Sequence, residues 1–250
     1  MKPLKFKFYA TLLDTFQGYL NSSELYQQYW GNSKDASKTE EEFENEQFHN
    51  LLNTINRIPH EINEKADRGT AFNEVVDCII LKKKSEKMDI SSNSVTGLIT
   101  VKYDGFTFQF PTALCREFSN YFNGAIPQVY TEGILETKYG NVLLYGYVDE
   151  LMPLAIHDIK TTTQYHAYKY RKNWQHRVYP FCMNQMGNSV KTFEYNITDF
   201  NNTYTEVYVY EPDRDIQELR IFCERFIEFL YMNSELITDK KIFAEEGILC

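Results

Sequence analysis

Cysteine is scarce in this sequence and shows no arrangement typical of a site. The five cysteines among 250 residues are widely scattered and include no C-x-x-C pair. Neither a disulfide framework nor a cysteine-ligated zinc or cluster site is therefore expected. There is also no run of about 18 apolar residues, the length that spans a bilayer. The basic start at Met1 lacks a small-residue cleavage site, so we expect a cytoplasmic protein without membrane contact.

Positively charged residues are also fewer than negatively charged ones. The 26 Lys and Arg residues face 35 Asp and Glu residues, which gives a formal net charge of −9. This argues against a surface covered with basic patches for nucleic acid, although it leaves room for a local basic groove. Hydrophobic residues make up 43% and charged residues 24%, which is typical of a globular chain and excludes a wholly disordered or collagen-like one.

Hydrophobic periodicity predicts both helices and strands, and hence an α/β chain with a mixed central β-sheet flanked by helices. Helices are expected over residues 10–30, 68–80, 111–123 and 167–186, and around the apolar stripe at 219–229. Strands are expected in a hairpin at 100–110, in three segments over 127–160, and near 190–196 and 205–210. Residues 32–50 are rich in charge, which predicts a solvated or mobile connection. Their acidic run is either a solvated surface or a mimic of nucleic acid.

Two carboxylates and one lysine carry the chemistry that the sequence suggests. Successive side chains of a strand alternate between its faces, so Asp158 and Lys160 are expected to point the same way. Asp149 ends the preceding strand, and a turn at 150–153 would bring it back beside Asp158. Two such carboxylates repel each other unless a cation lies between them. The pattern therefore predicts a site for a hard divalent cation with oxygen ligands, Mg²⁺ or Mn²⁺.

Lys160 has a specific use in such a site. Near a metal-bound water, an ammonium group can hold the nucleophile and offset the charge that builds on a phosphate. The local charge agrees with this, because residues 157–177 contain five Lys or Arg and one Asp, a net charge of +4. The site therefore suits phosphodiester hydrolysis. The cations expected to contact the phosphate backbone are Lys169, Arg171, Lys172 and Arg177.

Three ordered motifs resemble those of a known family. Gly146-Tyr-Val-Asp149, Asp158-Ile-Lys160-Thr161 and Gln175-His-Arg-Val-Tyr179 are similar to the G-x-x-D, D-x-K-T and Q-x-x-x-Y motifs of the RecB-like branch of the PD-(D/E)XK nuclease superfamily. Upstream, residues 69–74 resemble the family's G-x-x-x-H helix motif, with Asn73 where histidine is usual. The resemblance covers roughly residues 69–181, interrupted by 85–125.

The resemblance implies a restriction-endonuclease-like core and metal-dependent cleavage of DNA. A single domain over 1–250 is then expected, with an N-terminal helical segment (1–66) and a hairpin and helix insertion at about 85–125. By the resemblance, Asp149, Asp158 and the Ile159 carbonyl hold Mg²⁺ or Mn²⁺, and Lys160 is the catalytic lysine. Some relatives carry an iron–sulfur cluster, but the cysteine positions here do not match it, so none is expected.

The resemblance also assigns the remaining site positions. Gln175 and Tyr179, one helical turn apart, correspond to the pair that lines the site and contacts the scissile strand. The same two residues would also suit a helix face packed on the sheet, with Tyr179 in the core. With asparagine at position 73, Glu74 is the candidate for the upstream metal-binding acid.

The expected function is an exonuclease that hydrolyses phosphodiester bonds at DNA ends, double-stranded or single-stranded, by attack of an activated water on phosphorus. The chain length leaves little room for a sequence-reading domain, which disfavours a restriction enzyme. Two alternatives remain open: a DNA-binding module on the same scaffold whose chemistry has lapsed, supported by Asn73, and an endonuclease. Polarity, strand preference and oligomeric state are not readable from the sequence.

Overall fold

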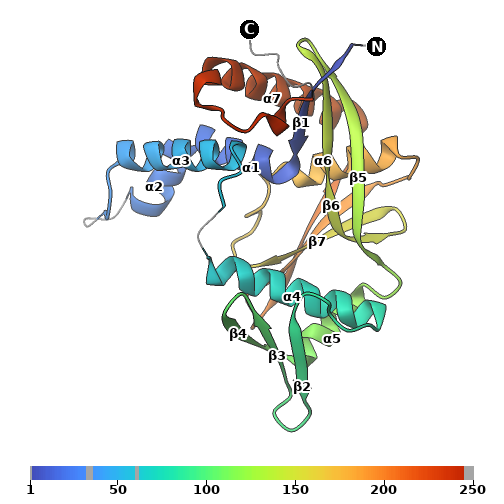
Figure 1. The fold of residues 1–250 in the computed structure, drawn as a ribbon. Helices are drawn as coiled ribbons and strands as arrows, with labels where there is room; N and C mark the ends of the chain where they lie inside the picture. The colour runs from blue at the N-terminus through green and yellow to red at the C-terminus, as the bar shows by residue number, and fades with distance from the viewer. Residues whose placement is uncertain (1, 32–35, 60–61, 245–250) are drawn as a thin grey trace.

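The computed structural model describes residues 2–31, 36–59 and 62–244. They form a mixed six-stranded sheet flanked by helices and a separate three-stranded sheet (Figure 1). The strands of the main sheet are β1 (Leu4–Tyr9), β5 (Ile126–Thr137), β6 (Gly140–Met152), β7 (Ala155–Thr161), β8 (Thr192–Thr198) and β9 (Thr203–Val209). Their order is β1-β6-β7-β8-β9, with β5 also paired to β6. The α/β class with a mixed sheet is therefore confirmed.

The long strand β6 has two different neighbours along one of its edges. β5 pairs with β6 over nearly its whole length, so the parallel β1 and the antiparallel β7 share the other edge. β1 pairs with residues 141–145 and β7 with residues 150–152. Between these two ladders, residues 146–149 of β6 lie where β7 has diverged to pair in parallel with β8. This fork brings the chain around Asp149 close to Ile159.

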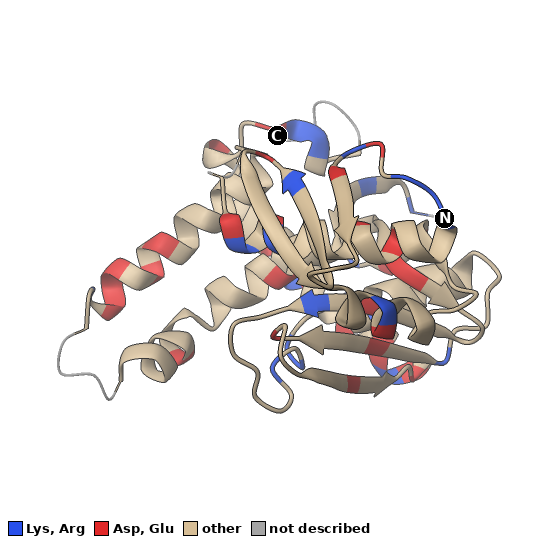
Figure 2. Ribbon diagram, turned by 90° about the horizontal axis from the view of Figure 1, so that it is seen from below, with Lys and Arg blue, Asp and Glu red and all other residues tan. Residues whose placement is uncertain are grey.

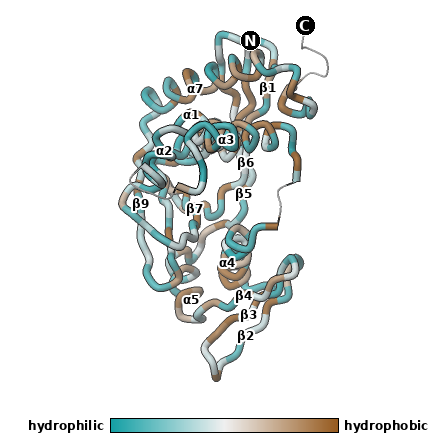
Figure 3. The backbone as a smooth tube through the Cα atoms, turned by 90° about the vertical axis from the view of Figure 1, so that its left-hand side faces the viewer, coloured by the Kyte–Doolittle hydropathy of each residue, from teal (hydrophilic) through white to brown (hydrophobic). Residues whose placement is uncertain are grey.

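The larger core cluster lies between the main sheet and four helices. These helices are α1 (Ala10–Leu20), α3 (Glu40–Ile55), α6 (Gln175–Gln185) and α7 (Pro212–Met232). Phenylalanine rings fill its centre. The ring centroid of Phe226 in α7 lies 4.9 Å from that of Phe8 in β1 and 4.8 Å from that of Phe16 in α1. Figure 3 shows the alternation of hydrophobic and hydrophilic turns along α7 that such one-sided burial requires.

A smaller core cluster lies around α4, on the side of Ile159. It is formed by α4 (Glu64–Leu81), β2 (Asp89–Asn93), β3 (Leu98–Tyr103), β4 (Phe106–Pro111) and α5 (Thr112–Tyr121). Phe72 of α4 packs against Phe110 and Phe118 at 5.4 and 5.1 Å between ring centroids. Ile159 of β7 belongs to the same cluster. Figure 1 shows α4 between the main sheet and the second sheet.

Several sequence predictions match these elements. The hairpin turn at 104–105, the three strands within 126–161, and the helices over 10–30, 68–80 and 112–121 are all present, with α2 (Ser22–Trp30) completing the first of these helical stretches. Two strands were not predicted: β1, within the segment 1–66 expected to be helical, and β2, which adds a third strand to the 85–125 insertion. No helix of the described residues is long and apolar enough to cross a membrane.

The prediction of a mobile connection over residues 32–50 was wrong from residue 40 onward. Residues 32–35 lie outside the described residues, but α3 begins at Glu40. Thr39 and Glu42 form a reciprocal capping box, which satisfies two backbone N–H groups at the helix start. Leu51 and Ile55 then bury this helix in the larger core cluster. Figure 2 shows the acidic residues of α3 on one of the two helices that project at the left of the view.

The predicted helix over 167–186 was too long at its start. α6 begins only at Gln175, and residues 167–172 form turns. Tyr168 has a φ of +61°, in the left-handed region that an α-helix does not contain. Part of this stretch still packs on the sheet, because the ring centroid of Tyr170 lies 5.2 Å from that of Tyr195 in β8.

Candidate active site

Asp149, Asp158 and Lys160 come together at the fork between β6 and β7. The Lys160 ammonium lies 2.7 Å from Asp158 Oδ2. The backbone N–H of Ile159 donates to Asp149 Oδ2 at 2.9 Å, which holds the end of β6 against β7. Asp158 is 3% exposed, and the side chain of Lys160 is 24% exposed. The two acids and the amine that the sequence placed in one site are therefore neighbours, with the lysine at the solvent side.

The helix α6 supplies a third contact to this group. Gln175 Nε2 donates to Asp158 Oδ1 at 2.9 Å, so both oxygens of Asp158 have a cationic or amide partner. Tyr179, one turn later, is buried and its ring lies directly over Gly146. A Cβ on residue 146 would approach the ring of Tyr179 to 2.7 Å, so this position accepts only glycine without a shift. Tyr179 is thus a core residue that shapes the back of the site.

The helix α4 closes the site from the other side. Gly69 allows a close approach to the end of β7, because a Cβ there would lie 2.8 Å from Thr161 Oγ1. One turn later, Asn73 Nδ2 donates to Asp149 Oδ2 at 3.3 Å. Glu74 points elsewhere: its carboxylate accepts from Ser85 Oγ at 2.7 Å and lies 3.7 Å from Lys87 Nζ. The structure therefore brings Asn73, and not the predicted ligand Glu74, into contact with Asp149.

A cleft of about 470 Å³ opens beside Asp149, Asn73 and Lys160. Its walls come from α4 on one side and from the ends of β6 and β7 on the other. Asp149, Ile159 and Lys160 form part of its lining, together with Lys65 and Lys87. The remaining lining residues are Ala66, Gly69, Thr70, Asn73, Glu74, Asp77, Gln128 and Thr161. The cleft is thus a polar space in which carboxylates and ammonium groups face each other.

The charges of the site perturb each other in a consistent direction. Burial, reinforced by the Asp158 carboxylate, raises the pKa of Asp149. Burial by itself would lower the pKa of Lys160, but the Asp158 and Asp149 carboxylates outweigh it and raise that pKa. Lys160 therefore stays protonated and can act as a hydrogen-bond donor or electrostatic partner but not as a base. The surroundings of Asp149 therefore favour binding of a proton or another cation to its carboxylate.

Three further acids near the site were not recognised in the sequence. Asp14 of α1 accepts a hydrogen bond from the Trp174 backbone N–H, and burial raises its pKa to about 7. Lys160 and Asp158 also act on this pKa, so Asp14 lies within reach of their charges. Behind Asp149, burial raises the pKa of both Asp77 and Glu150; the neighbouring Asp77 raises that of Glu150 further, while the hydrogen bond with Glu150 lowers that of Asp77. No spacing in the sequence relates Asp14, 144 residues upstream of Asp158, to this site.

The donor atoms of the fork fit a hard divalent cation. Among the described residues, no three His, Cys, Asp or Glu side chains form a ready-made metal site. The available set is instead two carboxylates, the Ile159 carbonyl and the Asn73 carboxamide, whose buried Oδ1 has no hydrogen-bond partner among the described residues. All of these are oxygen donors, the type that Mg²⁺ and Mn²⁺ prefer. Two buried carboxylates that share the single ammonium group of Lys160 leave a net negative charge, and such an ion would balance this charge and also use the free amide oxygen of Asn73.

The four predicted phosphate-binding cations lie in different surroundings. Lys169 donates to Gln164 O at 2.8 Å, and Arg171 is exposed. Lys172 Nζ lies 2.5 Å from Glu24 of α2. Arg177 points toward α7, where it lies 2.6 Å from Glu218 and 3.6 Å from Asp215. The structure thus directs Arg177 away from the cleft, and acidic partners on α2 and α7 neutralise part of the basic window.

Comparisons with known proteins leave the family open. No protein family model matches the sequence, and no curated protein matches it. Among solved structures, the crystal structure of SSO0001 is similar to this chain with a TM-score of 0.47 and 10% sequence identity. The similarity covers 92% of this chain and 79% of that chain. A likeness of this size identifies neither a family nor an activity.

Proposed function

We propose that this protein is a Mg²⁺- or Mn²⁺-dependent deoxyribonuclease with a restriction-endonuclease-like core of the RecB-like PD-(D/E)XK type. The observation that carries the proposal is the meeting of Asp149, Asp158 and Lys160 at the fork of β6 and β7, where Asp149 and Lys160 line a cleft. Two buried acids and one partly exposed ammonium group held together at the fork of the sheet are costly to keep without a function. Phosphodiester hydrolysis uses all three.

Each residue has a role that follows from its contacts. Asp149, Asp158, the Ile159 carbonyl and Asn73 would hold the cation, which when bound supplies positive charge and an activated water to the phosphate. Lys160 remains protonated and donates to the attacking water or to a phosphate oxygen, on which negative charge grows. Gln175 fixes the rotamer of Asp158 through its 2.9 Å hydrogen bond. Tyr179 and Gly146 keep α6 tight against β6 and so keep Gln175 in place.

An exonuclease acting on DNA ends is the form of this activity that we propose. The cleft of about 470 Å³ is walled on one side by α4 and on the other by the main sheet. The second sheet and α5 belong to the core cluster around α4, so the described chain provides no separate module to read a sequence. The absence of such a module among the described residues favours action at DNA ends over recognition of a sequence within an intact duplex.

The test is release of nucleotides from an end-labelled linear duplex and from a single strand, with Mg²⁺ or Mn²⁺. Wild-type protein is expected to release nucleotides, while Asp158→Asn and Lys160→Ala reduce the rate by about 10²-fold or more. The matched controls are Asp89→Asn and Lys102→Ala, an exposed pair on the second sheet with 3.8 Å between their charged groups. Both controls should retain the wild-type rate.

The other outcomes decide between the alternatives. Binding of DNA without cleavage in either metal would replace the nuclease with a binding module, the reading that the Asn73 position supports. Cleavage of a closed circular duplex would make the protein an endonuclease. An unchanged cleavage rate in Lys160→Ala would contradict the role assigned to Lys160 and the proposed mechanism with it. Far-ultraviolet circular dichroism of each variant establishes that the comparison is made between folded proteins.

A further inference from the structure

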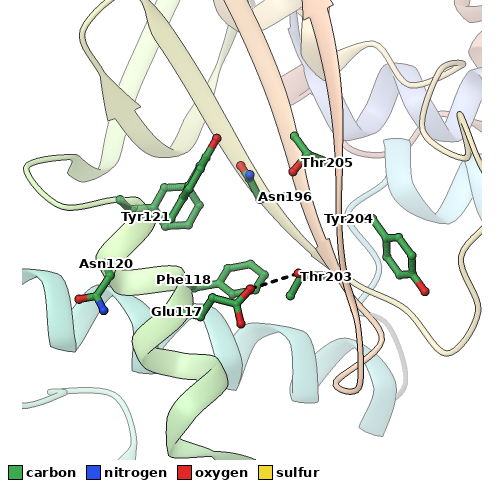
Figure 4. A pocket seen from close by; sticks show the side chains of 9 residues that line it. Glu117, Phe118, Asn120, Tyr121, Asn196, Thr203, Tyr204 and Thr205 are labelled. Atoms are coloured by element: carbon green, nitrogen blue, oxygen red, sulfur yellow. Dashed lines mark hydrogen bonds between the residues drawn. The ribbon is translucent and has the colours of Figure 1, made fainter.

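A second pocket lies away from the candidate active site, between α5 and the strands β8 and β9. Its volume is about 330 Å³, and it shares no lining residue with the cleft at Asp149. Figure 4 shows its side chains: Glu117, Phe118, Asn120, Tyr121, Phe122, Asn196, Thr203, Tyr204 and Thr205. This size is at the lower end of the range for ligand pockets, which favours a small molecule.

The alternation of the strands separates this pocket from the catalytic residues. Asn196 of β8 pairs with Ile159 of β7, and the side chains of Asn196 and His157 point to the same side of the sheet. Asp158 and Lys160, at the intervening positions of β7, point to the other side. The pocket is therefore built on the same two strands as the candidate active site, on the face opposite the side chains of Asp158 and Lys160.

The most buried polar group of the pocket is the Asn196 carboxamide, whose residue is only 6% exposed. Its Oδ1 lies 3.1 Å from Nδ1 of His157. His157 Nδ1 also lies 3.4 Å from Glu194 Oε2, so with two oxygen acceptors beside it this nitrogen is the donor and Asn196 Oδ1 accepts from it. Because the carboxamide oxygen is used in this way, the amide N–H₂ group is the end of Asn196 that a ligand meets.

Aromatic rings form the walls next to this amide. Phe118 is buried, and Tyr121 is 52% exposed, so Tyr121 can serve as a flank for a flat ring. The Tyr121 hydroxyl donates to Glu194 at 2.8 Å, which fixes the orientation of its ring. Figure 4 shows Phe118 between Asn196 at one end of the group and Glu117 at the other. A planar aromatic ligand is the shape that such walls accept.

The charge of the pocket restricts the ligand further. Glu117 is the one charged residue of its lining, and its carboxylate accepts from Thr203 Oγ1 at 3.1 Å. No Lys or Arg belongs to that lining, so a phosphate group would meet a carboxylate without a compensating cation. A carboxylate is, however, a good acceptor for hydroxyl groups such as those of a ribose. The ligand therefore has a hydrogen-bond acceptor on a flat ring at one end and hydroxyl groups at the other, and it carries no negative charge.

We propose that this pocket binds an uncharged nucleoside. Its base lies against Phe118 and Tyr121 and accepts a hydrogen bond from the Asn196 amide. Its ribose hydroxyls donate to Glu117. This site is independent of the proposed nuclease activity, since it shares none of the residues at Asp149, Asp158 and Lys160, and its test needs neither metal nor DNA.

Isothermal titration calorimetry of the full chain with adenosine tests the proposal. Wild-type protein is expected to bind adenosine at least tenfold more tightly than adenosine 5′-monophosphate. Thr205→Trp places an indole in the pocket from an exposed strand position and is expected to weaken adenosine binding at least tenfold. The matched control is Val207→Trp, two residues along the same face of β9 and outside the pocket, which should bind as wild type does.

A charge reversal gives a second test that does not depend on the tryptophan variants. Glu117 is exposed, so Glu117→Lys is expected to fold, to weaken adenosine and to strengthen adenosine 5′-monophosphate, reversing the order of the two ligands. The proposal is overturned by absence of adenosine binding at millimolar concentration in wild type. It is equally overturned if Thr205→Trp binds adenosine as Val207→Trp does, or if Glu117→Lys leaves the ligand order unchanged.

Discussion

At the scale of single residues, Gly146 shows why one motif position tolerates no side chain. A Cβ at this position would lie 2.7 Å from the Tyr179 ring, which is itself buried and cannot retreat. Gly146→Ala is therefore expected to reduce the free energy of unfolding by about 1–3 kcal/mol, the usual cost of overpacking. Chemical denaturation measures this change.

The control for this substitution is Gly18→Ala. Gly18 lies in α1, where a Cβ meets no atom within 4 Å, so alanine should stabilise the protein by about 0.5–1 kcal/mol through its helix propensity. Equal effects at the two positions would show that the close approach of α6 to β6 is not what selects glycine at position 146.

Asp14 makes stability depend on pH. Burial raises its pKa from 3.8 to about 7 in the folded protein, so between these values the folded state holds a proton that the unfolded state has released. Stability should therefore fall as pH rises from about 4 to about 7. Thermal unfolding in the presence of a chelator should show a shallower pH dependence for Asp14→Asn than for wild type. Parallel pH profiles for the two proteins would contradict this account.

At the scale of elements, α3 depends on local and long-range contributions that can be separated. The Thr39 hydroxyl accepts from the Glu42 backbone N–H at 3.2 Å, and the Glu42 carboxylate accepts from the Thr39 backbone N–H at 2.7 Å. Thr39→Ala removes the first of these and should cost about 1 kcal/mol of unfolding free energy.

Thr54→Ala is the matched control, near the other end of α3, where the hydroxyl donates to Asn50 O at 2.8 Å. A back-bonded threonine contributes little to a helix, so its loss should change the free energy of unfolding by less than about 0.5 kcal/mol. A Thr39→Ala effect as small as that of Thr54→Ala would mean that packing of Leu51 and Ile55 alone orders this helix.

At the scale of the whole molecule, the proposed cation should stabilise the fold by mass action. At a hundredfold excess over its Kd, an ion bound only by the folded state contributes about 2.7 kcal/mol. For a chain of this size that corresponds to a rise in Tm of about 5–10 °C. The rise should be larger at pH 8 than at pH 6, because burial and Asp158 raise the pKa of Asp149 and its proton must leave before the ion binds.

Differential scanning fluorimetry with Mn²⁺ measures this shift without any DNA substrate. Asp158→Asn should abolish it, while the exposed Asp89→Asn on the second sheet should retain it. A shift of the same size in both variants would place the ion elsewhere in the molecule and would leave the carboxylates at the fork without their assigned role.

Much of this organisation is local and is encoded in short stretches of the sequence. The two-residue period of a strand places Asp158 beside Lys160, and the capping pattern at Thr39 and Glu42 starts α3, although the charge around it suggested a mobile connection. Strand β1 was also available as alternation of Leu4, Phe6 and Phe8 with lysines. These features depend on neighbours within a few residues, so pattern and propensity suffice to predict them.

Contacts between residues far apart in the sequence could be seen only in the folded chain. The Trp174 backbone N–H binds Asp14 across 160 positions, and Lys172 pairs with Glu24 across 148. Arg177 faces the acids of α7 and not the cleft, since α6 begins at Gln175 and sets its direction. Such contacts result from how helices pack on the fork of β6 and β7, and no short-range pattern encodes that packing.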